Sequence, residues 1–401
     1  MMIESLFTSL PMVACLLCAT LIGIKLLRNH GVDDAPSRWL LVWLLTTTAL
    51  YWGHWIYFNH AMDAVPAAAV VYRAANLAVY PMFLLYVVSL TSTGNSVDRR
   101  WWLTLLPAVA MFAALGGLMA AMGGERAAAF AGSYPYDNNL AATHGLERAA
   151  AIAILCGKAV FPLTVIGVVV VAYRRMHDYE RRVDNFYSNS DGRNVRPLRQ
   201  LTIAMAVIAV TSIVAGLFGR HVFADTRWPL YTVSLVFTVL LLAITNEGYS
   251  LAPDLGRDDI TDAVPETDAT PVADDADTAA VEAARDELWR EVERLMDTGR
   301  LYLRPDLKIA DVAARLGSNR HYVYEAIKLG TGGLTFSDLV NRLRVNHAVT
   351  LLEAHPDLSI AEVAEQSGYN SITSFYRNFK RHMGCLPGDL PTPPNTDNKD
   401  N

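Results

Sequence analysis

The chain has 401 residues, which is long enough for two or three domains. It is 52% hydrophobic and only 18% charged, with a net charge of −6, and the apolar residues are concentrated in residues 1–250. This composition excludes an ordinary soluble protein for the N-terminal half and indicates a membrane component there. The four cysteines have no metal-ligand spacing, so we expect neither a metal site nor a disulfide framework.

Seven apolar segments in this half are each close to the roughly 20 residues that a helix needs to cross a bilayer. The only early charge is Glu4, and the basic residues Lys25 and Arg28 come at the far end of the first segment. We therefore expect a retained first helix rather than a signal peptide. The segments lie at about 3–27, 38–60, 67–92, 101–122, 148–173, 199–223 and 227–247.

Arginine is unevenly distributed between the loops that join these segments. Eleven arginines lie in the loops after the first, third and fifth segments, and only four lie in the alternate loops. Because cytoplasmic loops carry the excess of basic residues, the N-terminus is expected outside and the C-terminus in the cytoplasm.

Two cations fall inside the apolar segments: Arg73 about two turns into the third, and Lys158 near the middle of the fifth. A charge at the bilayer centre is costly, so such residues usually face a cavity, a partner or water. Together with His54 and Trp55 they define a hypothetical pocket, open to the outside, for a small anionic or polar ligand. The alternatives are that Arg73 snorkels to the outer surface and that the aromatic residues form an interfacial belt.

Residues 252–280 contain nine acidic residues, one Arg and three prolines, and no aromatic residue. Such a segment cannot bury enough apolar surface to offset its ordering entropy, so we expect it to be disordered. Its charge should extend it, which would make it a tether or a simple spacer.

An amphipathic helix is expected from about Val281 to Met296, docked on the domain that follows; dimerisation through it is the alternative. Segments 308–328 and 359–380 then share one pattern. Each has a short apolar-faced helix, a turn glycine, a polar capping residue and a second helix. This is the arrangement of a helix-turn-helix unit.

The segment between the two helix-turn-helix units has apolar residues at helical spacing over residues 336–354, which indicates a helix with one buried side. A helix of this length spans about 28 Å. It would hold two recognition helices about one turn of DNA, roughly 34 Å, apart.

Residues 285–390 resemble the DNA-binding domain of the AraC/XylS family of bacterial transcription regulators, and a seven-helix region before such a domain is similar to a membrane-bound subgroup of that family. A linking-helix motif and a longer second-unit motif carry the resemblance. They read Asn341-Arg342-x-Arg344…Ala348…Leu351-Leu352 and Ser359-Ile360-x-x-Val363-Ala364…Gly368-Tyr369-x-Ser371-x-x-x-Phe375-x-Arg377-x-Phe379-Lys380-x-x-x-Gly384-x-x-Pro387.

The resemblance implies that the N-terminal half of each second helix enters the major groove. Arg377 can pair with guanine O6 and N7, and Thr373 can offer a hydroxyl or a methyl group to a base. Glu325 stands where the family often has Arg; it can accept from cytosine but repels phosphate, which weakens the expected contribution of the first unit. The implied base-facing residues are Arg320, His321, Tyr324, Glu325, Thr373, Tyr376 and Arg377, with Lys380 and Arg381 on phosphates.

Two further features of this domain differ from what the resemblance implies for a strong DNA binder. Residues 387–391 read Pro-Gly-Asp-Leu-Pro where the family usually has a Tyr-Arg pair. Residues 285–390 also carry 14 basic and 14 acidic side chains. Since non-specific DNA affinity is mostly electrostatic, membrane confinement and self-association would have to raise the effective concentration.

These features predict an all-α chain: a seven-transmembrane helical bundle followed by an all-α DNA-binding domain with two helix-turn-helix units joined by a linking helix. The predicted domains are a membrane sensor domain (1–250), an acidic disordered linker (251–280), the DNA-binding domain (281–391) and a disordered tail (392–401). The expected location is the bacterial cytoplasmic (inner) membrane.

The expected function is a one-component sensor and transcription regulator; the alternative is a membrane-anchored latent regulator that proteolysis of the linker releases. No nucleophile elbow, phosphate-binding loop or paired carboxylate is present, so we expect no enzyme activity and no cofactor. The expected partners are double-stranded promoter DNA, the lipid bilayer, a small anionic or polar ligand, a second copy of the chain in a homodimer, and RNA polymerase.

Overall fold

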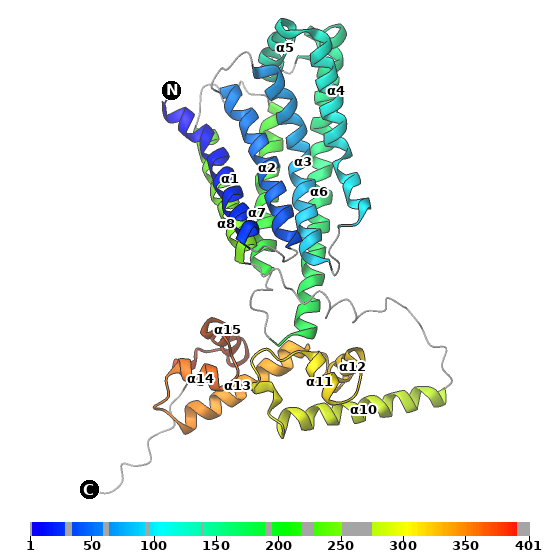
Figure 1. Ribbon diagram of the computed structural model, residues 1–401, viewed down its shortest axis with the longest axis vertical. Coiled ribbons are helices and arrows are strands. Elements are labelled where there is room, and N and C mark those ends of the chain that lie inside the picture. The colour runs from blue at the N-terminus through cyan, green and yellow to red at the C-terminus, as the bar shows by residue number, and fades with distance from the viewer. Residues whose placement is uncertain are drawn as a thin grey trace, which may run out of the picture. The chain divides into compact units, whose positions relative to one another are not determined.

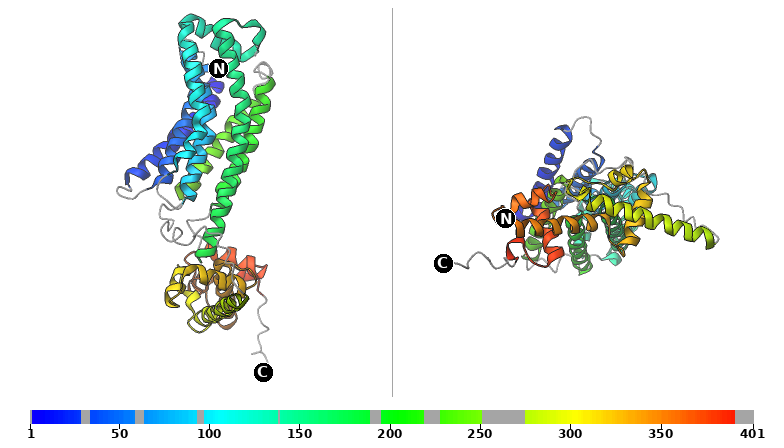
Figure 2. Two further views of the ribbon diagram at one scale, coloured as in Figure 1. Left: turned by 90° about the vertical axis from the view of Figure 1, so that its right-hand side faces the viewer. Right: turned by 90° about the horizontal axis from the view of Figure 1, so that it is seen from below.

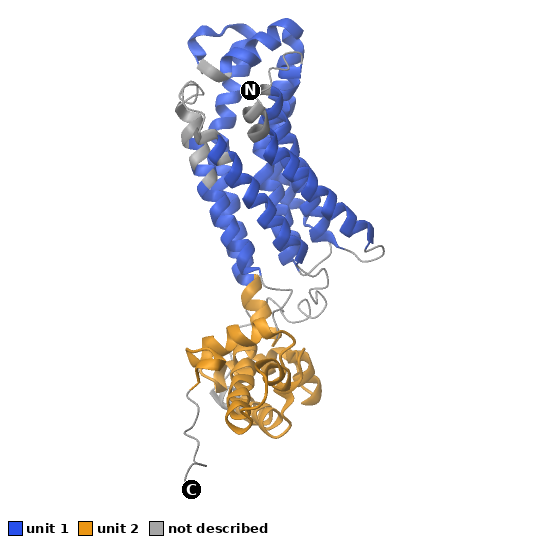
Figure 3. Ribbon diagram, turned by 90° about the vertical axis from the view of Figure 1, so that its left-hand side faces the viewer, with its two compact units in different colours: residues 1–178, 195–255 blue, residues 179–194, 256–401 orange. Residues whose placement is uncertain are grey.

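The computed structural model describes residues 2–28, 34–58, 64–92, 97–137, 139–188, 195–218, 228–250 and 275–390. In this part of the chain every regular element is a helix, and the only β-contact is an isolated bridge between Tyr187 and Lys308. The chain divides into two compact units, residues 1–178 with 195–255 and residues 179–194 with 256–401 (Figure 3). Residues 251–274 of the predicted acidic linker (251–280) and the whole predicted tail (392–401) lie outside the described residues.

Unit 1 consists mainly of long helices that run alongside one another (Figures 1 and 2). Its elements are α1 (Met2–Arg28), α2 (Ala35–Phe58), α3 (Val65–Thr91), η2 (Arg99–Leu105), α4 (Leu106–Met122), α5 (Gly124–Asp137), η3 (Leu140–Ala142), α6 (Gly145–Phe186), α7 (Arg196–Phe218) and α8 (Trp228–Ser250).

Each predicted apolar segment overlaps a helix of this unit, but the helix bounds differ from the prediction in two places. Helix α5 was not predicted, and α6 has 42 residues instead of the expected span at 148–173. Among the described helices, four are long and apolar enough to cross a membrane: Ser9–Arg28, Val65–Thr91, Arg99–Met122 and Gly145–Phe186. The count of seven spans therefore stays a prediction.

Helix α3 is the central helix of unit 1, since 78% of the residues in its most apolar stretch are buried, against 17% in the most apolar stretch of α6. Close contact with α2 is possible because residue 53 is glycine: a Cβ there would lie 2.7 Å from Cβ of Tyr72. The outer helices instead turn large aliphatic side chains outward, such as Leu163 (71% exposed) and Val207 (62% exposed). Unit 1 thus has an apolar outside as well as an apolar core.

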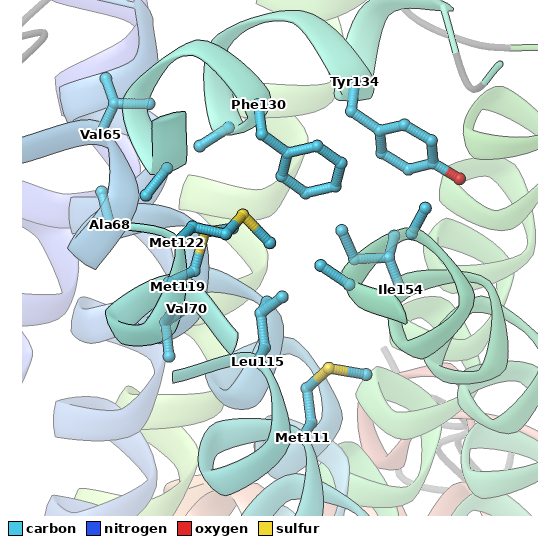
Figure 4. Packing of buried hydrophobic residues seen from close by; sticks show 14 of the residues in the cluster. Val65, Ala68, Val70, Met111, Leu115, Met119, Met122, Phe130, Tyr134 and Ile154 are labelled. Atoms are coloured by element: carbon cyan, nitrogen blue, oxygen red, sulfur yellow. The ribbon is translucent and has the colours of Figure 1, made fainter. Parts of the chain in front are cut away.

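One core cluster of unit 1 joins helices α3 to α6 (Figure 4). Met111, Leu115 and Met119 of α4 and Ile154 of α6 belong to this cluster, and the rings of Phe130 and Tyr134 on α5 stack 5.1 Å apart above them. Helix α5 therefore closes one end of this cluster with an aromatic pair.

Unit 2 contains the last residues of α6 and all described elements after the linker. These are α10 (Asp275–Asp297), η5 (Leu301–Leu303), α11 (Ile309–Arg315), α12 (Arg320–Gly330), α13 (Phe336–Ala354), α14 (Ile360–Gln366), α15 (Ile372–Met383) and η6 (Pro387–Asp389). Helix α13 lies between two helix pairs, α11 with α12 and α14 with α15 (Figure 1). Helix α10 begins six residues before the amphipathic helix expected from Val281, and Trp289 on it packs against Gly330 at the end of α12.

Candidate nucleic-acid interface

The two helix pairs of unit 2 have the same turn geometry. In the first, Gly317 has a φ of 58° and the N–H of Ser318 donates to the carbonyl of Ala313 at 2.9 Å. In the second, Gly368 has a φ of 82° and the N–H of Tyr369 donates to the carbonyl of Ala364 at 3.0 Å. A glycine in the left-handed region followed by this hydrogen bond ends a helix abruptly, so the next helix leaves at a steep angle.

Polar side chains cap the second helix of each pair. Asn319 accepts from the N–H of His321 at 3.0 Å, and Oγ of Ser371 accepts from the N–H of Ser374 at 3.3 Å. The first helix of the second pair begins with a capping box, in which the Glu362 carboxylate accepts from both N–H (2.8 Å) and Oγ (2.7 Å) of Ser359. The hydroxyl of Ser359, and then its N–H, lower the pKa of Glu362.

Helix α15 separates a buried face from an exposed polar face. Phe375 and Phe379 are fully buried in a cluster with α13 and α14. Thr373, Arg377 and Lys380 recur at a spacing of three or four residues and are exposed. In the second helix-turn-helix unit, these predicted base-facing and phosphate-binding side chains therefore share one accessible face of α15. Tyr376 lies beside them and is half-buried.

Two of the predicted cationic side chains of α15 have protein partners. One Nη of Arg377 donates to Oγ of Ser374 on its own helix at 3.1 Å. Arg381 forms an ion pair with Asp338 of α13, with an N–O distance of 3.0 Å. Arg381 would have to exchange Asp338 for a phosphate in order to bind DNA, which makes it a weaker candidate than Lys380.

In α12 the predicted residues are less accessible than those of α15. His321 is exposed, whereas Arg320, Tyr324 and Glu325 are half-buried. The ammonium group of Lys328, one turn after Tyr324, lies 5.7 Å from the centre of the Tyr324 ring. Lys328 was not among the predicted residues, although its helical spacing from Tyr324 places it on the same side of α12.

Arg344, in the middle of α13, is 1% exposed and contacts both the residues before the first helix pair and the turn of the second. Its Nε donates to the carbonyl of Tyr302 at 2.7 Å, and one Nη donates to the carbonyls of Arg304 (2.7 Å) and Pro305 (3.0 Å), all just before α11. Its guanidinium also lies 5.5 Å from the ring centre of Tyr369, which follows α14. Burial lowers the pKa of Arg344 to about 10, so it remains a cation at neutral pH.

The four residues of the predicted ligand pocket lie on α2, α3 and α6 of unit 1. The His54 ring packs edge-on against Tyr72, with 4.7 Å between ring centres, and Trp55 packs against the core cluster of Figure 4. Arg73 is half-buried on α3. Lys158 is half-buried on α6. No group of three or more metal-ligating side chains occurs among the residues that the structure describes.

Comparison with known proteins identifies the class of the second unit. A helix-turn-helix domain family matches residues 312–391, which begin within α11 and include α12 to α15. The chain is 31% identical over 81 residues to the Msm operon regulatory protein of Streptococcus mutans, covering 20% of this chain and 28% of that one. It is 29% identical over 80 residues to the TCP pilus virulence regulatory protein of Vibrio cholerae, with the same coverage. No solved structure gives a significant match.

The matched region decides how far these likenesses extend. The chain spans about 28% of the length of the curated relatives it matches. Residues 312–391 are thus a helix-turn-helix domain, and the helices of unit 1 lie outside the residues that this family matches.

Proposed function

We propose that this protein is a membrane-embedded transcription regulator of the AraC/XylS type, which binds promoter DNA through two helix-turn-helix units. The observation that carries the proposal is the repeated turn geometry at Gly317 and Gly368, with one helix, α13, between the two pairs. In such units the N-terminal half of the second helix enters the major groove, here α12 and α15.

The second helix-turn-helix unit supplies the side chains that would read the DNA sequence. Arg377 is long enough to reach O6 and N7 of a guanine in bidentate fashion, and Thr373 offers a hydroxyl or a methyl group to a base. Lys380 would bind phosphate, which fixes the register of the helix without reading sequence. Helix α13 has 19 residues and is about 28 Å long, close to the 34 Å of one DNA turn.

Membrane embedding of unit 1 is supported by its outward-facing aliphatic side chains. A soluble protein rarely exposes apolar patches of more than a few hundred Å². Side chains such as Leu163, Ile166 and Val207 are more than 60% exposed on helices that a bilayer would cover. We propose seven spans in the bacterial inner membrane, with the N-terminus outside and the helix-turn-helix domain in the cytoplasm.

Unit 1 is proposed to sense a small anionic or polar ligand or an envelope signal, with His54, Trp55, Arg73 and Lys158 as candidate contacts. A shift in the helices that carry them would change the DNA-binding activity of unit 2, either in one chain or through a homodimer. Contact with RNA polymerase would then alter transcription at the bound promoter.

The proposal is tested by crosslinking the intact protein to the genome in cells and sequencing the bound DNA. Discrete promoter peaks are expected for the native chain and for Arg294→Ala, which removes an exposed arginine on α10. The peaks should be lost in Arg377→Ala. A map without peaks in the native chain, or one that Arg377→Ala leaves unchanged, would refute sequence-specific binding through α15.

A further inference from the structure

The end of α6 and the two residues that follow it belong to the helix-turn-helix unit and not to the bundle. Residues 179–194 are grouped with unit 2, and Tyr179–Ser188 (the docking segment) is the described part of them (Figure 3). Val183, Tyr187 and Ser188 are each no more than 3% exposed, and Phe186 is 8% exposed. This segment precedes the matched domain by more than 100 residues, so no domain-level likeness accounts for its burial.

Ser188 is fully bonded to the unit. Its N–H and its hydroxyl both donate to the carbonyl of Leu307, at 3.1 Å and 2.7 Å. Its carbonyl accepts from Nδ2 of Asn341 at 3.0 Å, and its Oγ accepts from Nη2 of Arg344 at 3.3 Å. Every polar group of Ser188 therefore has a partner on α13 or on Leu307, just before α11, which marks a specific contact.

Two aromatic contacts extend this attachment to the first helix pair. Tyr187 and Lys308 form an antiparallel bridge, and the Lys308 ammonium lies 5.7 Å from the centre of the Tyr187 ring. The ring centres of Phe186 and Tyr324 are 6.2 Å apart. Tyr324 is on the second turn of α12, so the docking segment lies against the helix that the proposed function places in DNA.

A helix in the major groove leaves little room for a second segment. The groove is about 12 Å wide, and an α-helix with its side chains is about 10–12 Å in diameter. While the Phe186 ring lies against Tyr324, that side of α12 has no room beside it for base edges. The docked segment and DNA thus compete for α12.

We propose that the docking segment is an autoinhibitory element, which masks α12 when it is docked and frees the first helix-turn-helix unit when it is released. The inference rests on the proposed function, because masking matters only if α12 binds DNA. Helix α6 also carries Lys158, one of the candidate ligand contacts, so a signal received on α6 has a covalent route to this segment that does not use the acidic linker.

The test uses the full chain in lipid nanodiscs, with Tyr187→Cys and Lys308→Cys combined in a Cys385→Ser background. Bridged residues of antiparallel pairing have Cα atoms about 4.5–5.5 Å apart, which suits a disulfide. The probe is a duplex pool enriched from random DNA on the native chain. Oxidation should lock the docked state and lower the retained DNA about tenfold or more, because the apparent affinity scales with the competent fraction. A reductant should restore it, and the two variants that carry only one of the introduced cysteines should not respond.

A second variant removes the contact without a crosslink. Phe186→Ala loses one ring pair and should raise DNA retention about two- to tenfold. Leu163→Ala, on the same helix but exposed, is the control and should leave retention unchanged.

The possible failures are distinguishable. Failure of the disulfide to form would show that the segment is not docked, and equal retention in the oxidised and reduced forms would show that docking does not inhibit; either result overturns the inference alone. If the native chain retains no more DNA than Arg377→Ala, the proposed function fails, and the inhibition with it.

Discussion

Nη2 of Arg344 donates a hydrogen bond to Oγ of Ser188 at 3.3 Å, although the two residues are 156 positions apart in the chain. Arg344 also binds the carbonyls before α11 and faces the Tyr369 ring after α14. One buried cation therefore contacts the residues before the first helix pair, the turn of the second pair and the docking segment. A structural change in any one of these three parts can therefore alter the other two through Arg344, at the centre of α13.

Replacing Arg344 by Met should destabilise unit 2. The carbonyl oxygens of Tyr302, Arg304 and Pro305 would lose their donor in a partly buried place, where each such loss costs less than the roughly 1–3 kcal/mol of a fully buried group. We expect a combined loss of about 2–4 kcal/mol, measured as the opening free energy of amides 301–309 by hydrogen exchange in the full chain. Arg342→Met, at an exposed position two residues away, is the control, with an expected effect within about 0.5 kcal/mol. Equal effects of the two variants would contradict the role given to Arg344.

The two turn glycines should differ in their tolerance of alanine. Both have positive φ, which costs a non-glycine residue about 1–2 kcal/mol. A Cβ at Gly317 would meet nothing within 4 Å, whereas a Cβ at Gly368 would lie 2.6 Å from the carbonyl oxygen of Leu303. Gly368→Ala should therefore lower the unfolding midpoint of unit 2 clearly more than Gly317→Ala. The same midpoint for both variants would mean that the Leu303 backbone moves aside freely.

Acid should destabilise unit 2 through two histidines. Burial, and then the charge of Arg300, lower the pKa of His347 from its usual 6.5, and burial followed by Arg381 lowers that of His382, against the opposing effect of Asp338. The folded unit then binds fewer protons than the unfolded chain, so stability falls as the pH drops below about 6.5 and levels off below the folded pKa. Unfolding midpoints between pH 5 and pH 7.5 should show this slope. The slope should flatten in the double variant His347→Gln with His382→Gln, and a slope of the same size there would assign the effect to other groups.

Glu325→Gln should strengthen DNA binding. The half-buried Glu325 carboxylate on α12 repels phosphate, and removing its charge should lower the Kd by a few-fold at low salt. The gain should shrink as salt screens the repulsion. The measurement is the Kd on a selected duplex at two salt concentrations, with Glu353→Gln at an exposed position of α13 as the control. Weaker binding by Glu325→Gln would instead indicate that the carboxylate accepts from a base.

The helices of unit 2 could be predicted closely because apolar spacing, capping residues and turn glycines agree there. The segment predicted at 336–354 coincides with α13 (Phe336–Ala354), and the second pair begins and ends near its predicted positions. The burial of Arg344 could not be predicted from this pattern, because hydrophobic periodicity treats an arginine as a solvent-facing residue. Its carbonyl partners are backbone groups, which leave no mark in the sequence.

The length of α6 was underestimated for a different reason. Arg174, Arg175, Arg181 and Arg182 indicated a cytoplasmic loop, and charge ended the predicted segment at residue 173. Met176, Tyr179, Val183 and Phe186 nevertheless recur at intervals of three or four residues, and all four are buried. A second apolar stripe continuing past the apolar segment was the available signal for the docking segment.

The sequence could predict which candidate site residues share a helix face, but not which other residues they contact. Thr373, Arg377 and Lys380 share an exposed face because their spacing is helical, which the sequence contains. That Arg381 pairs with Asp338, and that Tyr324 lies against Phe186, depends on packing between elements far apart in the chain. Local pattern carries no information about such contacts.

Helix α13 contains neither glycine nor proline, and it is buried along one side from Phe336 to Ala348. It is therefore a stiff spacer, and the operator must match it in rotational phase. Inserting about five base pairs between the two half-sites would turn the second groove to the opposite side of the duplex, since one turn takes about 10–10.5 base pairs. Promoters served by this protein should accordingly tolerate base changes between their half-sites more readily than changes in the number of base pairs, unless the DNA bends to compensate.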